Sequence, residues 1–94
     1  MRKMVEVEYV GIEDVQEIID DAYAIMCEGH YVNVEISSII NQLRVRVIIM
    51  LGGWKKDKEY DYLFEFEMSD NQEDVSKMHE CKCVLNNLLV EDRR

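Results

Sequence analysis

Carboxylates are the side chains of this sequence that could do chemistry, and their distribution is uneven. No Lys or Arg occurs between Met4 and Leu43. That segment carries nine carboxylates, namely Glu6, Glu8, Glu13, Asp14, Glu17, Asp20, Asp21, Glu28 and Glu35. The rest of the chain nearly balances in sign, so the net charge of −9 comes from this segment. A surface of this charge repels nucleic acid and attracts a basic protein, chiefly by raising the association rate.

The spacing of these acids suggests a specific role. Residues 12–28 have the periodicity of a helix, and the polar side of that helix holds Glu13, Glu17, Asp20, Asp21 and Glu28. Carboxylates one turn apart recur about every 5–6 Å, close to the roughly 6–7 Å between phosphates of a nucleic-acid strand. Glu6, Glu8 and Glu35, from neighbouring predicted strands, extend the surface. The pattern predicts a nucleic-acid mimic, and the alternative is a solvated face that serves only solubility.

The same carboxylates are poorly arranged for catalysis or for Mg²⁺ and Ca²⁺. No calcium-binding loop spacing and no glycine-rich phosphate loop is present. Adjacent helical residues such as Asp20 and Asp21 point about 100° apart, which suits chelation badly. We therefore expect no enzyme and no cofactor.

Cysteine and histidine leave one metal alternative open. Cys27 and His30 end the first predicted helix, and His79 and Cys83 lie four residues apart on the last one. These four could close a tetrahedral zinc site, although their spacing is not that of a common zinc finger. Buried thiols with surface histidines are the interpretation we prefer.

Period-two alternation predicts four strands, at residues 4–10, 31–40, 43–51 and 60–68. Helical spacing predicts helices over residues 12–28 and about 71–90. In the first helix the predicted buried stripe is Val15, Ile18, Ile19, Ala22, Ile25 and Met26. Gly29 is expected to cap that helix, and a capping box beginning at Ser69 is expected to open the last helix.

Two hairpins follow from these strands. A turn at Asn41 and Gln42 would pair Ile40 with Leu43 and place Ile36 opposite Val47. The next hairpin would place Val47 opposite Phe64, with Arg44 and Arg46 on the other face opposite Glu67 and Glu65. That other face also receives apolar side chains that helices would not cover, namely Ile39, Ile48, Met50 and Leu63. With Trp54 in the long loop, they form a predicted oligomer or partner patch.

The predicted architecture is a single α+β domain over residues 1–94, a two-layer sandwich in the order β-α-β-β-β-α. Its four-stranded mixed sheet contains an antiparallel meander, and both helices cover one face. The chain has no apolar run long enough to span a membrane, and its start lacks the apolar core of a signal peptide. With an odd number of cysteines, this indicates a cytoplasmic protein.

In overall character the chain resembles the small acidic inhibitors of phages and mobile elements, in particular anti-CRISPR proteins that block Cas nucleases as DNA mimics. The resemblance lies in the short, proline-free, acidic α+β chain and carries over no individual residue. It implies a non-catalytic protein that acts in the cytoplasm of a bacterial host and binds the basic DNA-recognition surface of a nuclease. The alternative is a homo-oligomeric structural or adaptor module, for example a homodimer, whose acidic face is only solvated.

Overall fold

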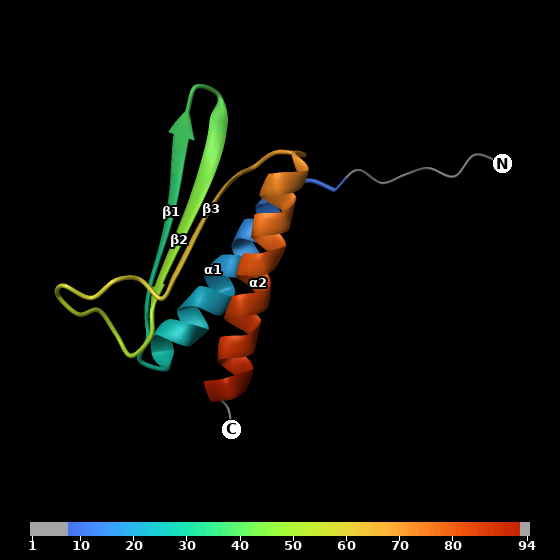
Figure 1. Cartoon of the computed structure of the whole chain (residues 1–94). Helices are drawn as coiled ribbons and strands as arrows, with labels where there is room; N and C mark the ends of the chain where they lie inside the picture. The colour runs from blue at the N-terminus through green and yellow to red at the C-terminus, as the bar shows by residue number, and fades with distance from the viewer. Residues whose placement is uncertain (1–7, 93–94) are drawn as a thin grey trace.

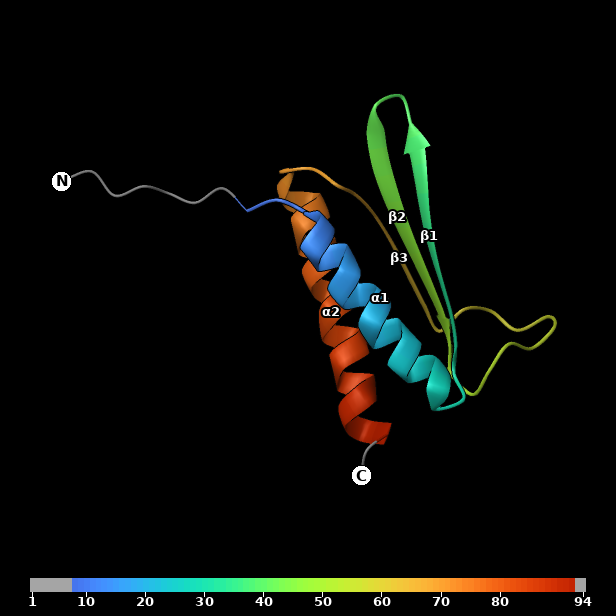
Figure 2. The same ribbon diagram turned by 180° about the vertical axis from the view of Figure 1, so that it is seen from behind.

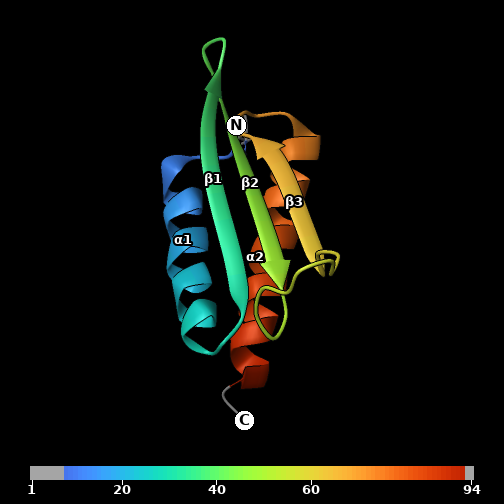
Figure 3. The same ribbon diagram turned by 90° about the vertical axis from the view of Figure 1, so that its left-hand side faces the viewer.

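The computed structural model describes residues 8–92, apart from the side chains of Ile39 and Asp92. Its elements follow the order α1 (Ile12–Cys27), β1 (Tyr31–Ile39), β2 (Gln42–Met50), β3 (Tyr62–Glu67) and α2 (Gln72–Asp92). The three strands form one antiparallel sheet in the order β1-β2-β3. Both helices pack on the same face of this sheet, so the α+β prediction is confirmed (Figure 1). Seen through the sheet, α1 lies beside β1, and α2 lies behind β2 and β3 (Figure 3).

The predicted first strand is not part of this sheet among the described residues. Residues 4–7 of that strand lie outside the described part of the chain. Residues 8–10 are described and are not strand, although the Val10 N–H donates to the Ser69 carbonyl at 2.8 Å. This hydrogen bond holds Val10 against the loop that follows β3, and α1 begins two residues later. Within residues 8–92 the sheet therefore has three strands, all antiparallel, and the prediction of a mixed sheet is wrong there.

The core lies between the sheet and the two helices. β2, the central strand, contributes Val45, Val47 and Ile49, all fully buried. α1 contributes Val15, Ile18, Ala22 and Ile25, and α2 contributes Val75, Met78, Cys81, Leu85 and Leu88. The alternation of β2 and the three-to-four-residue spacing of the helices direct these groups inward.

Local capping fixes the ends of both helices. Gly29, at φ +95°, ends α1 as predicted: its N–H donates to the Met26 carbonyl, and the His30 N–H donates to the Ile25 carbonyl. α2 begins after Asn71, whose side-chain oxygen accepts the Glu73 N–H at 2.9 Å. The Asp74 carboxylate accepts the Ser69 hydroxyl and the Glu67 N–H, which joins the start of α2 to the end of β3.

The first hairpin keeps its predicted inward face but is shifted by two residues. Val34 pairs with Val47, and Ile39 pairs with Gln42, so the turn residues are Ile40 and Asn41. Both have positive φ, +44° and +60°, as a two-residue turn between twisted strands requires. Asn tolerates this conformation, whereas a β-branched Ile is strained in it. The alternation of apolar residues determines which face of each strand is buried, and a shift of two residues preserves that face. Because no glycine marks the turn, the sequence does not distinguish between the two registers.

The second hairpin matches the prediction. Val45 pairs with Phe66, Val47 with Phe64 and Ile48 with Leu63. Loop 51–61 joins the strands and projects on the side of the sheet away from the helices (Figure 2). The Asp61 carboxylate anchors the loop by accepting the Leu51 N–H at 2.7 Å and pairing with Lys58 at 3.3 Å. That backbone N–H, followed by Lys58, lowers the pKa of Asp61.

The predicted apolar patch on this outer face is wrong in its two central members. Ile48 is only 8 % exposed and Met50 only 1 %. Both lie on the central strand, where Asn33 and Leu63 flank Ile48 and Tyr31 flanks Met50. Neighbouring side chains therefore cover them without a helix. Leu63 and Trp54 are exposed as predicted, and the Ile39 side chain is outside the described structure.

Candidate protein-binding surface

The carboxylates of α1 divide into two groups in the structure. Asp14 and Glu17 face α2, where the Lys82 ammonium lies 2.5 Å and 2.7 Å from their oxygens. Four others form no ion pair with any residue in the described range 8–92: Glu13, Asp20, Asp21 and Glu28. We call these four the acidic row. The sequence, which has no Lys or Arg near this helix, led us to overestimate its free negative charge. Lys82, from the last helix, neutralises part of that charge.

The ion pairs of Lys82 with Asp14 and Glu17, which we call the Lys82 bridge, join the two helices. Burial by itself would raise the pKa of Asp14, but hydrogen bonds from Lys82 and from the Gly11 N–H outweigh it and lower that pKa. Burial likewise opposes the charge on Lys82, and its bonds to Asp14 and Glu17 raise its pKa on balance. Asp14 and Lys82 are therefore both charged at neutral pH.

Asp21 has the opposite balance. Burial raises its pKa first, and the neighbouring carboxylates of Glu17 and Asp20 raise it further, against a smaller attraction from Lys82. A carboxylate whose neighbours disfavour its charge is favoured by any incoming positive group. Asp21 is therefore the member of the acidic row at which a basic partner would gain most.

The supporting carboxylates of the predicted mimic are less available. Glu8 contacts His79 of α2 at 2.5 Å. Glu35 lies on the outer face of the sheet, 4.0 Å from Arg46, and Glu6 is outside the described residues. The structure thus assembles the α1 part of the predicted surface and directs Glu35 to the other side of the molecule.

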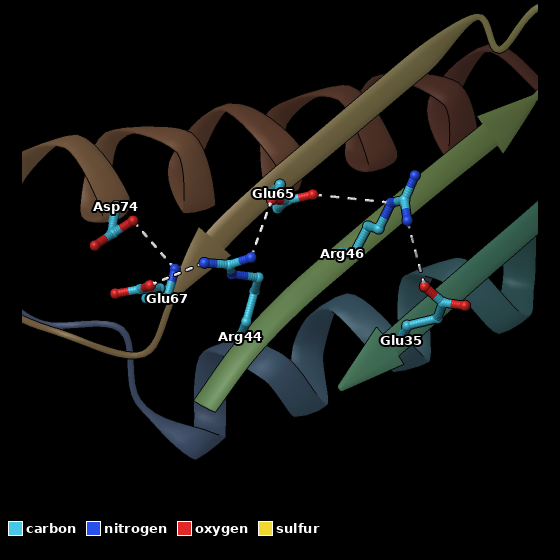
Figure 4. Close-up of polar contacts among 6 residues, drawn as sticks. All are labelled: Glu35, Arg44, Arg46, Glu65, Glu67 and Asp74. Carbon is cyan, nitrogen blue, oxygen red and sulfur yellow. Dashed lines mark hydrogen bonds and ion pairs between the residues drawn. The ribbon is translucent and has the colours of Figure 1, made fainter. Parts of the chain in front are cut away.

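An ion-pair network occupies that outer face. Arg44 lies 3.6 Å from Glu65 and 3.3 Å from Glu67, and Arg46 lies 3.9 Å from Glu65 (Figure 4). The cross-strand register had predicted the Arg44–Glu67 and Arg46–Glu65 pairs, and both are confirmed. Two arginines facing three carboxylates leave little free charge there. This face is therefore a weak candidate for binding either an acid or a base.

The residues of the zinc alternative are not brought together. Within residues 8–92, no three His, Cys, Asp or Glu side chains are grouped so as to hold a metal ion. The Nδ1 atom of His30 accepts the Gly52 N–H at 2.9 Å, and His79 contacts Glu8. Cys27 and Cys83 are exposed, while Cys81 is buried, which raises its pKa to about 12. A thiol protonated at neutral pH is neither a nucleophile nor a ready ligand.

A second surface feature of α1 was assigned wrongly from the sequence. Ile19 and Met26, predicted to be buried, are exposed together with Ile12 and Tyr23. Helical periodicity could not exclude Ile19 and Met26, because they lie next to the buried line on the helix circumference. We call these four residues the apolar stripe. The combination of an apolar stripe and an acidic row on one helix is typical of a protein-binding surface.

Comparison with known proteins finds no family model, curated protein or solved structure that matches the chain. Among residues 8–92, neither helix is long and apolar enough to cross a membrane.

Proposed function

We propose that this protein is a non-catalytic inhibitor that binds a basic, nucleic-acid-binding protein through the acidic row of α1. One observation carries the proposal: three carboxylates of α1 and that of Glu28, the residue that follows the helix, have no partner base among the described residues. Uncompensated charge of one sign on a rigid element accelerates association with an oppositely charged surface. A Cas nuclease in the bacterial cytoplasm is the partner class that the acidic character of the chain favours.

The spacing of the acidic row refines the mimicry. Glu13 and Asp20 are seven residues apart, as are Asp21 and Glu28, which corresponds to about 10.5 Å along a helix. This exceeds the distance of roughly 7 Å between successive phosphates of one strand, because Lys82 occupies Glu17 between them. The acidic row would therefore compete with nucleic acid for a basic surface through its negative electrostatic potential. It would not place one carboxylate at each phosphate position.

A displacement experiment tests the proposal. A fluorescent DNA duplex is bound to a purified type II Cas nuclease, and the protein is titrated in while anisotropy is recorded. The charge-reversed variant, called the α1 variant, carries Glu13→Lys and Asp20→Lys on α1 and Glu28→Lys at its C-terminal cap. Its matched control carries Glu73→Lys, Glu80→Lys and Glu91→Lys on α2, which also reverses one first-turn acid and two later acids of a helix.

We expect the unmodified protein and the α2 variant to displace the DNA and the α1 variant to lose at least 10-fold in apparent affinity. That factor corresponds to about 1.4 kcal/mol. Added salt should weaken the competition, because the interaction is between exposed charges. Equal competition by both variants would contradict the proposal and leave the acidic row as a solvated surface.

A further inference from the structure

The apolar stripe lies on the side of α1 that faces away from α2. Its members Ile12, Ile19, Tyr23 and Met26 are 57 %, 42 %, 68 % and 43 % exposed. They are spaced by seven, four and three residues, so they form one line along the helix. Asp14 and Glu17, which bind Lys82 of α2, lie on the opposite side of the helix circumference. The stripe therefore borders the flank of the molecule at which α1 lies beside β1 (Figure 3).

The edge strand at that flank has free backbone groups among the described residues. The Leu43 carbonyl accepts the Met68 N–H, and the Ile49 carbonyl accepts the Asp61 N–H, so these residues of β2 face β3. The residues of β1 opposite this set point the other way, toward the free edge. By the register they are Val32, Val34, Ile36 and Ser38.

Among residues 8–92, this edge lacks the features that usually prevent strands from pairing. β1 contains no Pro, Lys or Arg, and Glu35 is its one charged residue. Proteins commonly protect an exposed edge with such residues, with a bulge, or with a covering segment. The exposed Ile36 lies on the same strand, and the β1-β2 turn extends beyond the ends of both helices (Figures 1 and 2). Strand edge, stripe and turn together form an apolar flank that no segment of residues 8–92 covers.

We propose that this flank binds a second copy of the chain, with the two β1 edges paired antiparallel about a twofold axis at Val34. Val32 of each copy would then lie opposite Ile36 of the other, and all of these residues direct their backbone groups toward the shared edge. This register also places Glu35 opposite Asn33 and keeps the two Glu35 side chains from facing each other. The result is a continuous six-stranded sheet with an isologous interface.

The same symmetry covers the apolar stripe. α1 ends four residues before β1 begins, so the end of α1 lies beside the start of β1. Antiparallel pairing brings the start of one β1 to the end of the other, which places Tyr23 and Met26 of one copy near Ile36 of the second. A flank about 24 Å long and two layers, about 20 Å, deep would bury on the order of 1,000 Å² in total, the lower limit for a specific interface.

The proposal does not rest on the proposed inhibitory function, and salt separates the two. Pairing brings two acidic α1 helices side by side, so their repulsion is screened by salt and association should strengthen as ionic strength rises. Binding to a basic partner should weaken over the same range.

Sedimentation equilibrium is the first test. We expect a mass of two chains for the unmodified protein and of one chain, 11.2 kDa, for Ile19→Lys with Tyr23→Lys. Leu63→Lys, a matched change at a 49 % exposed side chain on β3, should keep the mass of two chains. The proposal is overturned if the unmodified protein stays at one chain up to its solubility limit. It is also overturned if the variant with Ile19→Lys and Tyr23→Lys retains the mass of two chains or if Leu63→Lys dissociates the dimer.

Disulfide trapping tests the register without relying on those variants. In a background with Cys27→Ser and Cys83→Ser, Val34→Cys places two thiols at the proposed axis, with Cα atoms about 5.5 Å apart, within disulfide range. Ser37→Cys on the same strand would lie about 20 Å from its counterpart. We expect the first variant to form a covalent dimer under mild oxidation and the second to remain a single chain. Equal cross-linking of both variants, or of neither, would overturn the proposed pairing.

Discussion

The two helices of this protein pack on the same face of one sheet, yet their exposed surfaces differ. α2 exposes one large apolar side chain, Val90, and supplies Lys82 to its neighbour. α1 exposes the four residues of the apolar stripe, and beside them lies the acidic row, whose carboxylates have no ion-pair partner within residues 8–92. Both helices bury a comparable line of side chains against the sheet. The additional features of α1 are therefore not required by the core, which is why we assign binding to this helix.

If the helices have equal roles in the core, their buried lines should be equally sensitive to truncation. Ile18 of α1 and Leu85 of α2 are both fully buried in the same cluster. We expect Ile18→Ala and Leu85→Ala each to lower the free energy of unfolding by about 3 kcal/mol, from lost burial and the cavity left behind. Urea denaturation followed by circular dichroism measures both. A loss under 1 kcal/mol for either variant would show that the helices are not equivalent in the core.

The Lys82 bridge is the point at which the two exposed surfaces meet. Lys82→Met keeps the apolar stem of the side chain but leaves Asp14 and Glu17 without a base, at an expected cost of about 1.5 kcal/mol at pH 7. The lowered pKa of Asp14 means that its contribution is present above its unfolded value of 3.8 and is lost as the pH falls through the folded value. The raised pKa of Lys82 means that its contribution is lost only as the pH rises through a value above 10.5.

Urea titrations of Lys82→Met across pH therefore test both signs. The deficit should be constant at neutral pH and should shrink below pH 3.8. Lys77→Met, at an exposed position of the same helix, should change stability by less than about 0.5 kcal/mol. A deficit that persists unchanged in acid would assign the role of Lys82 to packing alone.

Asp21 should give the smallest effect and the opposite sign. Its pKa is raised above 3.8, so the fold loses stability as the pH rises through the folded value. Asp21→Asn should therefore stabilise the protein by about 0.5 kcal/mol at pH 7, and the gain should vanish below pH 3.8. Glu80→Gln on α2 is the matched neutralisation, for which we expect a smaller change. A destabilised Asp21→Asn protein would indicate that this carboxylate has a structural partner.

The regular elements could be predicted because their apolar periodicity is strong. The hairpin from Gln42 to Glu67 was predicted in its pairing, since a one-residue slip would expose every apolar side chain on it. The first hairpin was displaced by two residues, a shift that preserves the faces, and its turn has no glycine to fix it.

Three features of the surface depend on tertiary contacts that a single sequence does not reveal. Lys82 reaches Asp14 across 68 residues of chain. Met50 is buried on the outer face of the sheet beside Tyr31, and Ile19 is exposed on the side of α1 that faces away from α2. The location of charge and the cross-strand ion pairs were thus predictable from the sequence, whereas the neutralisation of Asp14 and Glu17 by Lys82 was not.

Because Cys81 is buried, its reactivity can report when α2 detaches from the sheet. Its thiol, with a pKa of about 12, lies in the core beneath the sheet, whereas Cys27 and Cys83 are exposed. An alkylating reagent should modify the two exposed thiols at once and reach Cys81 only when α2 detaches from the sheet. The rate of that third modification would therefore follow the opening of α2 in the intact protein, without any substitution.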